Sequence, residues 1–155
     1  MQYVPQFQRL LTGLAERLGL GALTADPHSG RCILLVNGDL TLELGLLDER
    51  PVMTVAADLC PLPREREEAL METLLAENLF PSAMDLSFGY DPTSQRVRLH
   101  AAFTLADLEE VSLYRALDRF FKVASHWRKK IPELPREPEG EPNPVVLGGP
   151  DLLRV

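Results

Sequence analysis

CILLVNGDLTLELGL, residues 32 to 46, decides the fold of this chain. Its second half has leucine at every second position from Leu40 to Leu46, with small or polar residues between them. This alternation is typical of a strand with one buried and one solvated face. The Asn37-Gly38 pair before it favours a tight turn between antiparallel strands. The stretch therefore predicts a β-hairpin.

The first strand of this hairpin is apolar on both sides. Ile33 and Leu35 alternate with Cys32, Leu34 and Val36. A small sheet packed with helices offers few layers to cover both faces of such a strand. We therefore expect one side of the strand to face a partner.

Helices and further strands are expected on both sides of the hairpin. Apolar residues at helical spacing from Phe7 to Leu18 predict a first helix that ends at Gly19. Residues 51 to 60 alternate and predict a third strand, and residues 64 to 79 predict a second helix. The second helix is expected to break at Pro81.

A second hairpin and a long helix follow in the sequence. Alternation over residues 84 to 91 and 96 to 103, joined by DPTSQ, predicts the hairpin. The long helix starts near Leu108 and is expected to stop at Pro132. Its apolar stripe is Leu113, Leu117, Phe120, Ala124 and Trp127. The order α-β-β-β-α-β-β-α predicts the α+β class, with a twisted antiparallel sheet packed with helices.

Composition predicts one domain followed by a tail. The chain has 155 residues, and residues 132 to 155 hold six of its 13 prolines. Proline at this density prevents regular helix and central strand, so we predict a domain over residues 1 to 131 and a disordered tail over 132 to 155. The residues leave open whether the tail is a targeting segment.

Charge and cysteine content exclude several classes of partner. Sixteen Lys and Arg against 23 Asp and Glu leave a net charge of -7, which opposes binding to nucleic acid or to an anionic membrane. No apolar run reaches the ~18 residues of a membrane span, and residues 1 to 10 lack the features of a signal peptide. Cys32 and Cys60 are expected to stay reduced. These features predict a cytosolic protein without membrane insertion.

Catalytic and metal-binding motifs are missing from the sequence. His28, His100 and His126 have no metal-ligand spacing, and Cys60 has no CxxC partner. There is no GxSxG, no P-loop and no GxGxxG. Glutamates over residues 65 to 77 are explained as a solvated helix face. We therefore predict no catalytic residue, no metal, no cofactor and no enzymatic activity.

The second helix has a broad apolar arc. Leu70, Met71, Leu74, Leu75 and Leu79 span more than one of its faces. Such a helix is either buried on two sides within a monomer or packed against its own copy in a symmetric dimer. We favour the homodimer.

Three segments, with the order of elements and the acidic character, resemble the class I type III secretion chaperones of the Tir-chaperone type. The segments are LLVNGDLTLELGLLDE at residues 34 to 49, LLAENLF at 74 to 80 and LSFGYDPTSQRVRLHAAFTL at 86 to 105. The resemblance covers roughly residues 4 to 131, and it departs from the family in the long proline-rich tail. Since none of the segments is a catalytic motif, their order and spacing carry the resemblance.

The resemblance implies a cytoplasmic bacterial homodimer without cofactor or ATP hydrolysis. Such a protein binds the N-terminal region of a secreted effector, keeps it from folding or aggregating, and delivers it to the export apparatus. The implied dimer is built from the second helix and the strand after it. Its candidate residues here are Leu70, Met71, Leu74, Leu75, Phe80, Leu86 and Phe88.

Effector segments in such chaperones lie extended over the first helix and the sheet. Candidate contact residues here are Phe7, Leu10, Leu14, Ile33, Leu35, Leu47 and Val52, several of which could equally belong to the core. Main-chain pairing at a sheet edge gives affinity in this mode of binding, and apolar pockets select alternate side chains.

Two alternatives from other classes stay open. A small regulatory, adaptor or small-molecule-binding domain could share the same α+β layout, but a small-molecule site would need an enclosed cavity with convergent polar groups. An enzyme with an unrecognised carboxylate pair is the other alternative. The distribution of apolar residues favours open patches, and therefore the chaperone.

Overall fold

One antiparallel sheet forms the centre of the fold. The computed structural model describes residues 3–38, 40–47, 50–79 and 85–134, and within them five strands pair in the order β1-β2-β3-β5-β4. The strands are β1 (Arg31–Val36), β2 (Leu40–Leu46), β3 (Val52–Pro61), β4 (Ser87–Asp91) and β5 (Arg96–Thr104). Strands β1 and β4 therefore lie at the two edges of the sheet.

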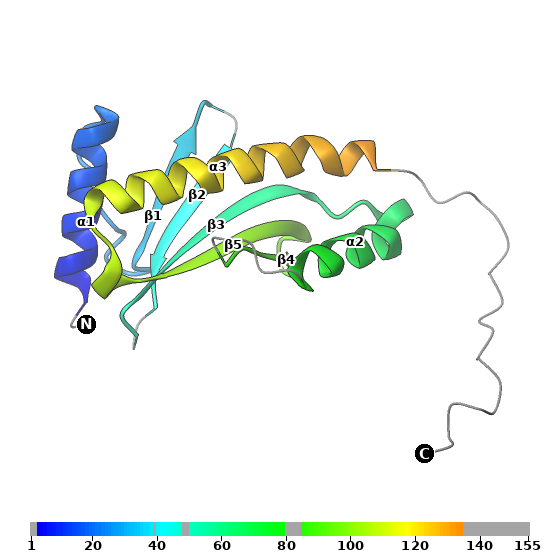
Figure 1. The fold of residues 1–155 in the computed structure, drawn as a ribbon, viewed down its shortest axis with the longest axis horizontal. Helices are drawn as coiled ribbons and strands as arrows, with labels where there is room; N and C mark the ends of the chain where they lie inside the picture. The colour runs from blue at the N-terminus through cyan, green and yellow to red at the C-terminus, as the bar shows by residue number, and fades with distance from the viewer. Residues whose placement is uncertain (1–2, 39, 48–49, 80–84, 135–155) are drawn as a thin grey trace, which may run out of the picture.

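Helices pack on one face and at the ends of this sheet. Helix α3 (Glu110–Glu133) runs along the sheet (Figure 1). Helix α1 (Val4–Leu18) lies beside the N-terminal half of α3, and α2 (Glu67–Leu79) lies next to β4 at the opposite end of the molecule. A 3₁₀ turn at Arg64–Arg66 precedes α2. The predicted α+β class and the order of the elements are confirmed.

The predicted hairpin of residues 32 to 46 is present. Val36 pairs with Leu40, and Asn37 and Gly38 have φ angles of 53° and 68°. Asparagine and glycine tolerate this left-handed conformation better than other residues, so the Asn-Gly pair sets the turn. The meander of β1, β2 and β3 and the pairing of β4 with β5 also follow the prediction.

The core lies between the helices and one face of the sheet. Every second residue of β2 and β3, from Leu42 to Leu44 and from Met53 to Leu59, is buried there. The stripe predicted on α3 meets them, and Ile131 extends it by one turn. Among the residues that the structure describes, no helix is long and apolar enough to cross a membrane.

Two predicted boundaries are wrong. Helix α3 does not stop before Pro132 but includes it and ends at Glu133, because proline in the last turn removes only one hydrogen-bond donor. Strand β4 begins at Ser87 instead of Met84, and Met84 lies outside the described residues. Alternation over residues 84 to 91 puts Tyr90 on the same, apolar side as Phe88, yet Tyr90 is 39% exposed because β4 is an edge strand.

Candidate binding surface

The two edge strands of the sheet differ in the hydrogen bonds that their outward-facing backbone groups make. At β4, the side-chain amide of Asn78 donates to the Phe88 carbonyl (2.9 Å) and accepts from the Phe88 N–H (2.7 Å). At β1, the backbone of residues 32 to 36 makes no hydrogen bond to other described residues except those of β2. Strand β1 is therefore the edge whose outward donors and acceptors are free for an added strand.

Helices leave the other face of the sheet uncovered. On this open face, Ile33 is 67% and Leu35 65% exposed, and they lie side by side along β1. Leu47, just after β2, is also exposed. One side of the first strand is therefore uncovered within the chain, and the expectation that it faces a partner stays a prediction. Large apolar side chains at this exposure mark contact surfaces when they cluster.

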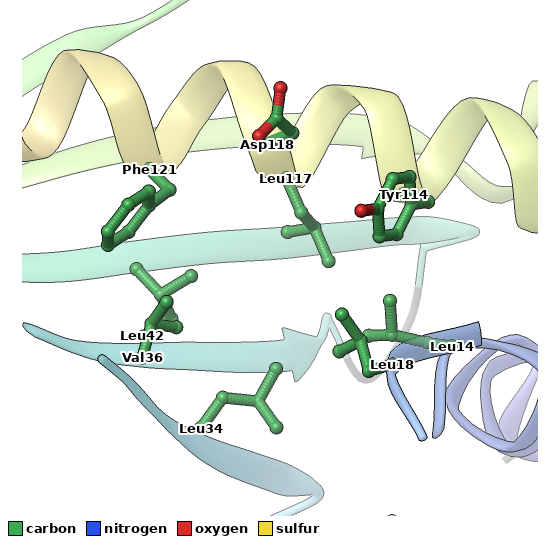
Figure 2. A pocket seen from close by; sticks show the side chains of 9 residues that line it. All are labelled: Leu14, Leu18, Leu34, Val36, Leu42, Tyr114, Leu117, Asp118 and Phe121. Atoms are coloured by element: carbon green, nitrogen blue, oxygen red, sulfur yellow. The ribbon is translucent and has the colours of Figure 1, made fainter. Parts of the chain in front are cut away.

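A pocket lies on the opposite side of β1, between the sheet and two helices. Leucine and valine side chains from β1 and β2 point toward α3, whose aromatic side chains point back toward them, and α1 closes one end (Figure 2). The residues that line it are Leu14, Leu18, Leu34, Val36, Leu42, Tyr114, Leu117, Asp118 and Phe121.

This pocket is small, apolar and open to solvent. Its volume is about 120 Å³, close to the roughly 150 Å³ of a leucine-lined cavity that accepts benzene. The carboxylate of Asp118 is held by Lys122 at 2.7 Å on the exposed side of α3. The remaining lining can therefore receive an aliphatic or aromatic side chain without leaving a buried charge unpaired.

Charged residues form a row across the open face from β1 to β5. Glu43 lies between Arg31 (3.0 Å) and Arg98 (3.1 Å). Asp58 lies between Arg98 (2.7 Å) and Arg96 (3.6 Å). This cross-strand charge row makes the middle of the open face polar, beside the exposed apolar side chains of Ile33 and Leu35 on β1.

Burial shifts the pKa of three side chains on the sheet toward their neutral forms. Burial lowers the pKa of His100 on the open face, and the neighbouring Arg98 lowers it further, so the ring is neutral at pH 7. Burial raises the pKa of both cysteine thiols, which are unpaired and protonated at neutral pH. Within the described part of the chain, no group of three histidine, cysteine or acidic residues could hold a metal ion.

The predicted contact residues fall into two groups. Ile33, Leu35 and Leu47 are exposed and Val52 is half-buried, so they can form part of a contact surface. Three residues of α1 cannot, because their side chains face α3 and the sheet and are buried in the core. They are Phe7, Leu10 and Leu14. For these three residues the structure selects the core, the alternative that the sequence left open, and Leu14 also lines the end of the pocket.

Helix α2 separates its apolar arc into an inner and an outer face. Leu70 and Leu74 are buried in the chain's own core. Met71 is half-buried, and Leu75 (66%) and Leu79 (73%) are exposed at successive four-residue steps along the outer face. Leu86 and Phe88 are half-buried, and Phe80 lies outside the described residues.

Of the nine residues that line the pocket, Leu14 alone was among the predicted contacts, and Leu18, Val36, Tyr114 and Phe121 are among the eight that were not. Tyr114 and Phe121 are seven residues apart, beside the buried stripe of α3, and this second stripe is visible in the sequence. The sequence does not show, however, that α1 and β1 lie opposite that stripe. The pocket therefore depends on tertiary packing.

Comparisons with known proteins identify a family and a relative for this chain. Residues 9–128 match the Tir chaperone protein (CesT) family. The transcriptional anti-antiactivator ExsC of Pseudomonas aeruginosa is 28% identical over 132 residues, which are 85% of this chain and 90% of ExsC.

Solved structures share the fold. A crystal structure of the ExsC–ExsE complex superposes with a TM-score of 0.74 at 28% identity, over 81% of this chain and 93% of that one. The HopA1–SchA chaperone–effector complex gives 0.70 at 18% identity, over 83% and 98%, and supports the fold alone. The family and these structures are chaperones or binding proteins, not enzymes. Since the family match spans most of the described residues, this chain belongs to the Tir chaperone (CesT) family of type III secretion chaperones.

Proposed function

We propose that this chain binds an extended N-terminal segment of a secreted effector in the bacterial cytoplasm, keeps it soluble and unfolded, and delivers it to the export apparatus. The observation that carries the proposal is β1, an edge strand whose outer backbone groups are unpaired and which has apolar surface on both of its faces. A strand added along β1 would gain main-chain hydrogen bonds and bury side chains on both faces.

Alternation in the added strand divides its side chains between two surfaces. Every second residue would lie on the open face beside Ile33 and Leu35, and the others would point toward the pocket beside Leu34 and Val36. The client pays an ordering cost of a few kcal/mol, which a long wrapped surface offsets. We expect the bound segment to be rich in aliphatic residues at consecutive positions, because both faces of β1 are apolar.

The outer face of α2 is the surface we assign to a second copy of this chain. Half-buried Met71 and exposed Leu75 and Leu79 form an apolar stripe, and a two-fold axis would pack this stripe against itself. We therefore propose that the protein is a homodimer. The boundary of the domain near residue 131 and a separate tail remain part of the proposal.

Replacing Leu75 by aspartate is expected to dissociate this dimer. The unmodified protein should scatter light with a mass near twice 17.3 kDa, and Leu75→Asp should shift it toward a single chain. Leu74→Asp is the informative comparison, because Leu74 is buried and its replacement should unfold the chain. A folded Leu75→Asp protein that keeps the dimer mass would place the interface elsewhere.

A regulatory role is the second candidate. The observation that favours it is the 28% identity to ExsC, an anti-antiactivator, across 85% of this chain. In that role the same edge strand and pocket would bind a regulatory protein that opposes transcription. The two roles share one binding surface and differ in the identity of the client.

Co-expression with the product of the neighbouring gene tests the proposed function. The two proteins are expected to co-purify, and deletion of the N-terminal region of the partner should abolish co-purification. Retention of the partner after that deletion would contradict binding through an N-terminal segment. A partner that represses transcription when this chain is absent would select the regulatory role, whereas a partner found in the culture medium would select the chaperone role.

A further inference from the structure

The pocket beside β1 continues along α3 as a longer groove. Val36 and Phe121 line both the pocket and a neighbouring hollow formed with Ser125, Arg128 and Lys129. The groove therefore extends from Tyr114 to Lys129. At 1.5 Å per helical residue, its length is about 22 Å.

The two ends of this groove differ in character. Leucines of α1, β1 and β2 line the end near Tyr114, whereas Arg128 and Lys129 make the other end basic. The basic end lies toward the C-terminus of α3, where the described chain leaves the helix at Leu134 (Figure 1). A segment that enters this groove from Leu134 should therefore carry acidic residues first, for the basic end, and aliphatic residues after them, for the end near Tyr114.

The chain's own tail has this order of residues. Residues 135 to 155 read PREPEGEPNPVVLGGPDLLRV, in which Glu137, Glu139 and Glu141 precede the aliphatic run Val145 to Leu147. Prolines on both sides of the glutamates favour an extended backbone, which loses less entropy on binding than a flexible one.

The tail is long enough to run back along α3 to the pocket. From Leu134 to Val145 there are 11 residues, which span about 34 Å in an extended proline-rich conformation. The distance back along the helix from Leu134 to Phe121 is only about 20 Å at 1.5 Å per residue. The tail therefore has enough length to reverse direction and reach the pocket.

Spacing within the tail matches spacing along the helix. Lys129 and Phe121 are about 12 Å apart on α3, and Glu141 and Val145 are also about 12 Å apart in an extended segment. When Val145 lies at Phe121, Glu141 lies at Lys129 and Leu147 lies near Leu117. The later pair Leu152 and Leu153 does not have this spacing from the glutamates.

We propose that residues 141 to 147 of the tail occupy this groove when no client is bound. The tail then competes with the client for the pocket beside β1, and this consequence rests on the proposed function. Docking of the tail does not rest on the proposed function, because it depends only on the groove and on the tail sequence.

Two full-length double variants test the docking. Val145→Asp with Leu147→Asp removes the aliphatic run, and Leu152→Asp with Leu153→Asp is the matched control, with the same added charge later in the tail. Amide chemical shifts of residues 34 to 38 and 114 to 129, measured by NMR, should change in the first variant and stay as in the unmodified chain in the second. Identical groove shifts in all three proteins would overturn the proposal, since the groove would then be empty or covered by a second copy.

Competition is measured separately, with the N-terminal segment of the co-purified partner as probe. If the tail occupies the groove nine-tenths of the time, Val145→Asp with Leu147→Asp should tighten binding about tenfold. Shift changes without tighter binding would leave the docking intact and remove the pocket from the proposed client site. Equal affinity together with unchanged shifts would overturn the docking itself.

Discussion

Replacement of Ile33 and Leu35 together by lysine is expected to weaken client binding by at least about 100-fold. Each aliphatic side chain buried on binding contributes about 1.5–3 kcal/mol, and about 1.4 kcal/mol corresponds to a tenfold change in Kd. Both side chains are about two-thirds exposed on the open face, so the fold should not depend on them. Lysine is common on natural edge strands, where it blocks pairing with other chains.

Titration calorimetry with the client's N-terminal segment measures this loss. Val111→Lys is the matched control, because Val111 is an exposed apolar residue on α3 that does not line the pocket. The control should bind as the unmodified chain does, and circular dichroism should be unchanged in both proteins. Client affinity that survives in the double variant would rule out β1 as the binding edge.

Truncation of Phe120 to alanine is expected to lower the free energy of unfolding by about 3–5 kcal/mol. The Phe120 side chain is fully buried between α3 and the sheet, at the centre of the predicted stripe. Its removal leaves a cavity, because neighbouring side chains relax only partly. Since a dimer's stability depends on concentration, the two proteins must be unfolded in urea at one fixed protein concentration.

Arg119→Ala is the control for this loss. Arg119 is the preceding residue on α3 and is exposed, so its replacement should change stability by no more than about 0.5 kcal/mol. A Phe120→Ala protein within about 1 kcal/mol of the unmodified chain would mean that the stripe does not carry the core.

Strands were predictable because their period is two. In residues 32 to 46 a single register separates Leu34 from Ile33, and the turn at Asn37-Gly38 fixes that register. Exposure of Ile33 and Leu35 therefore follows from the sequence once one face of the sheet is covered. Spacing of three and four residues, the period of a helix, identified the stripe of α3 from Leu113 to Trp127.

Helix surfaces were harder to predict because an apolar side chain does not specify its neighbour. Phe7 and Leu10 were expected to be contact residues, yet α1 packs against α3 and buries them. On α2, Leu74 and Leu75 are adjacent in the sequence but point into the core and out of it, respectively. Where helices dock on the sheet depends on contacts between distant parts of the chain, which local periodicity does not encode.

Asn78 limits how many strands the sheet can accept. Because its amide occupies both backbone groups of Phe88, β4 resists extension at the same place where β1 permits it. Fibre growth needs two receptive edges on every subunit, so that each new copy offers the next one a template. In this sheet β1 can accept an added strand, whereas β4 is blocked at Phe88, so we expect one added strand per subunit and no polymerisation.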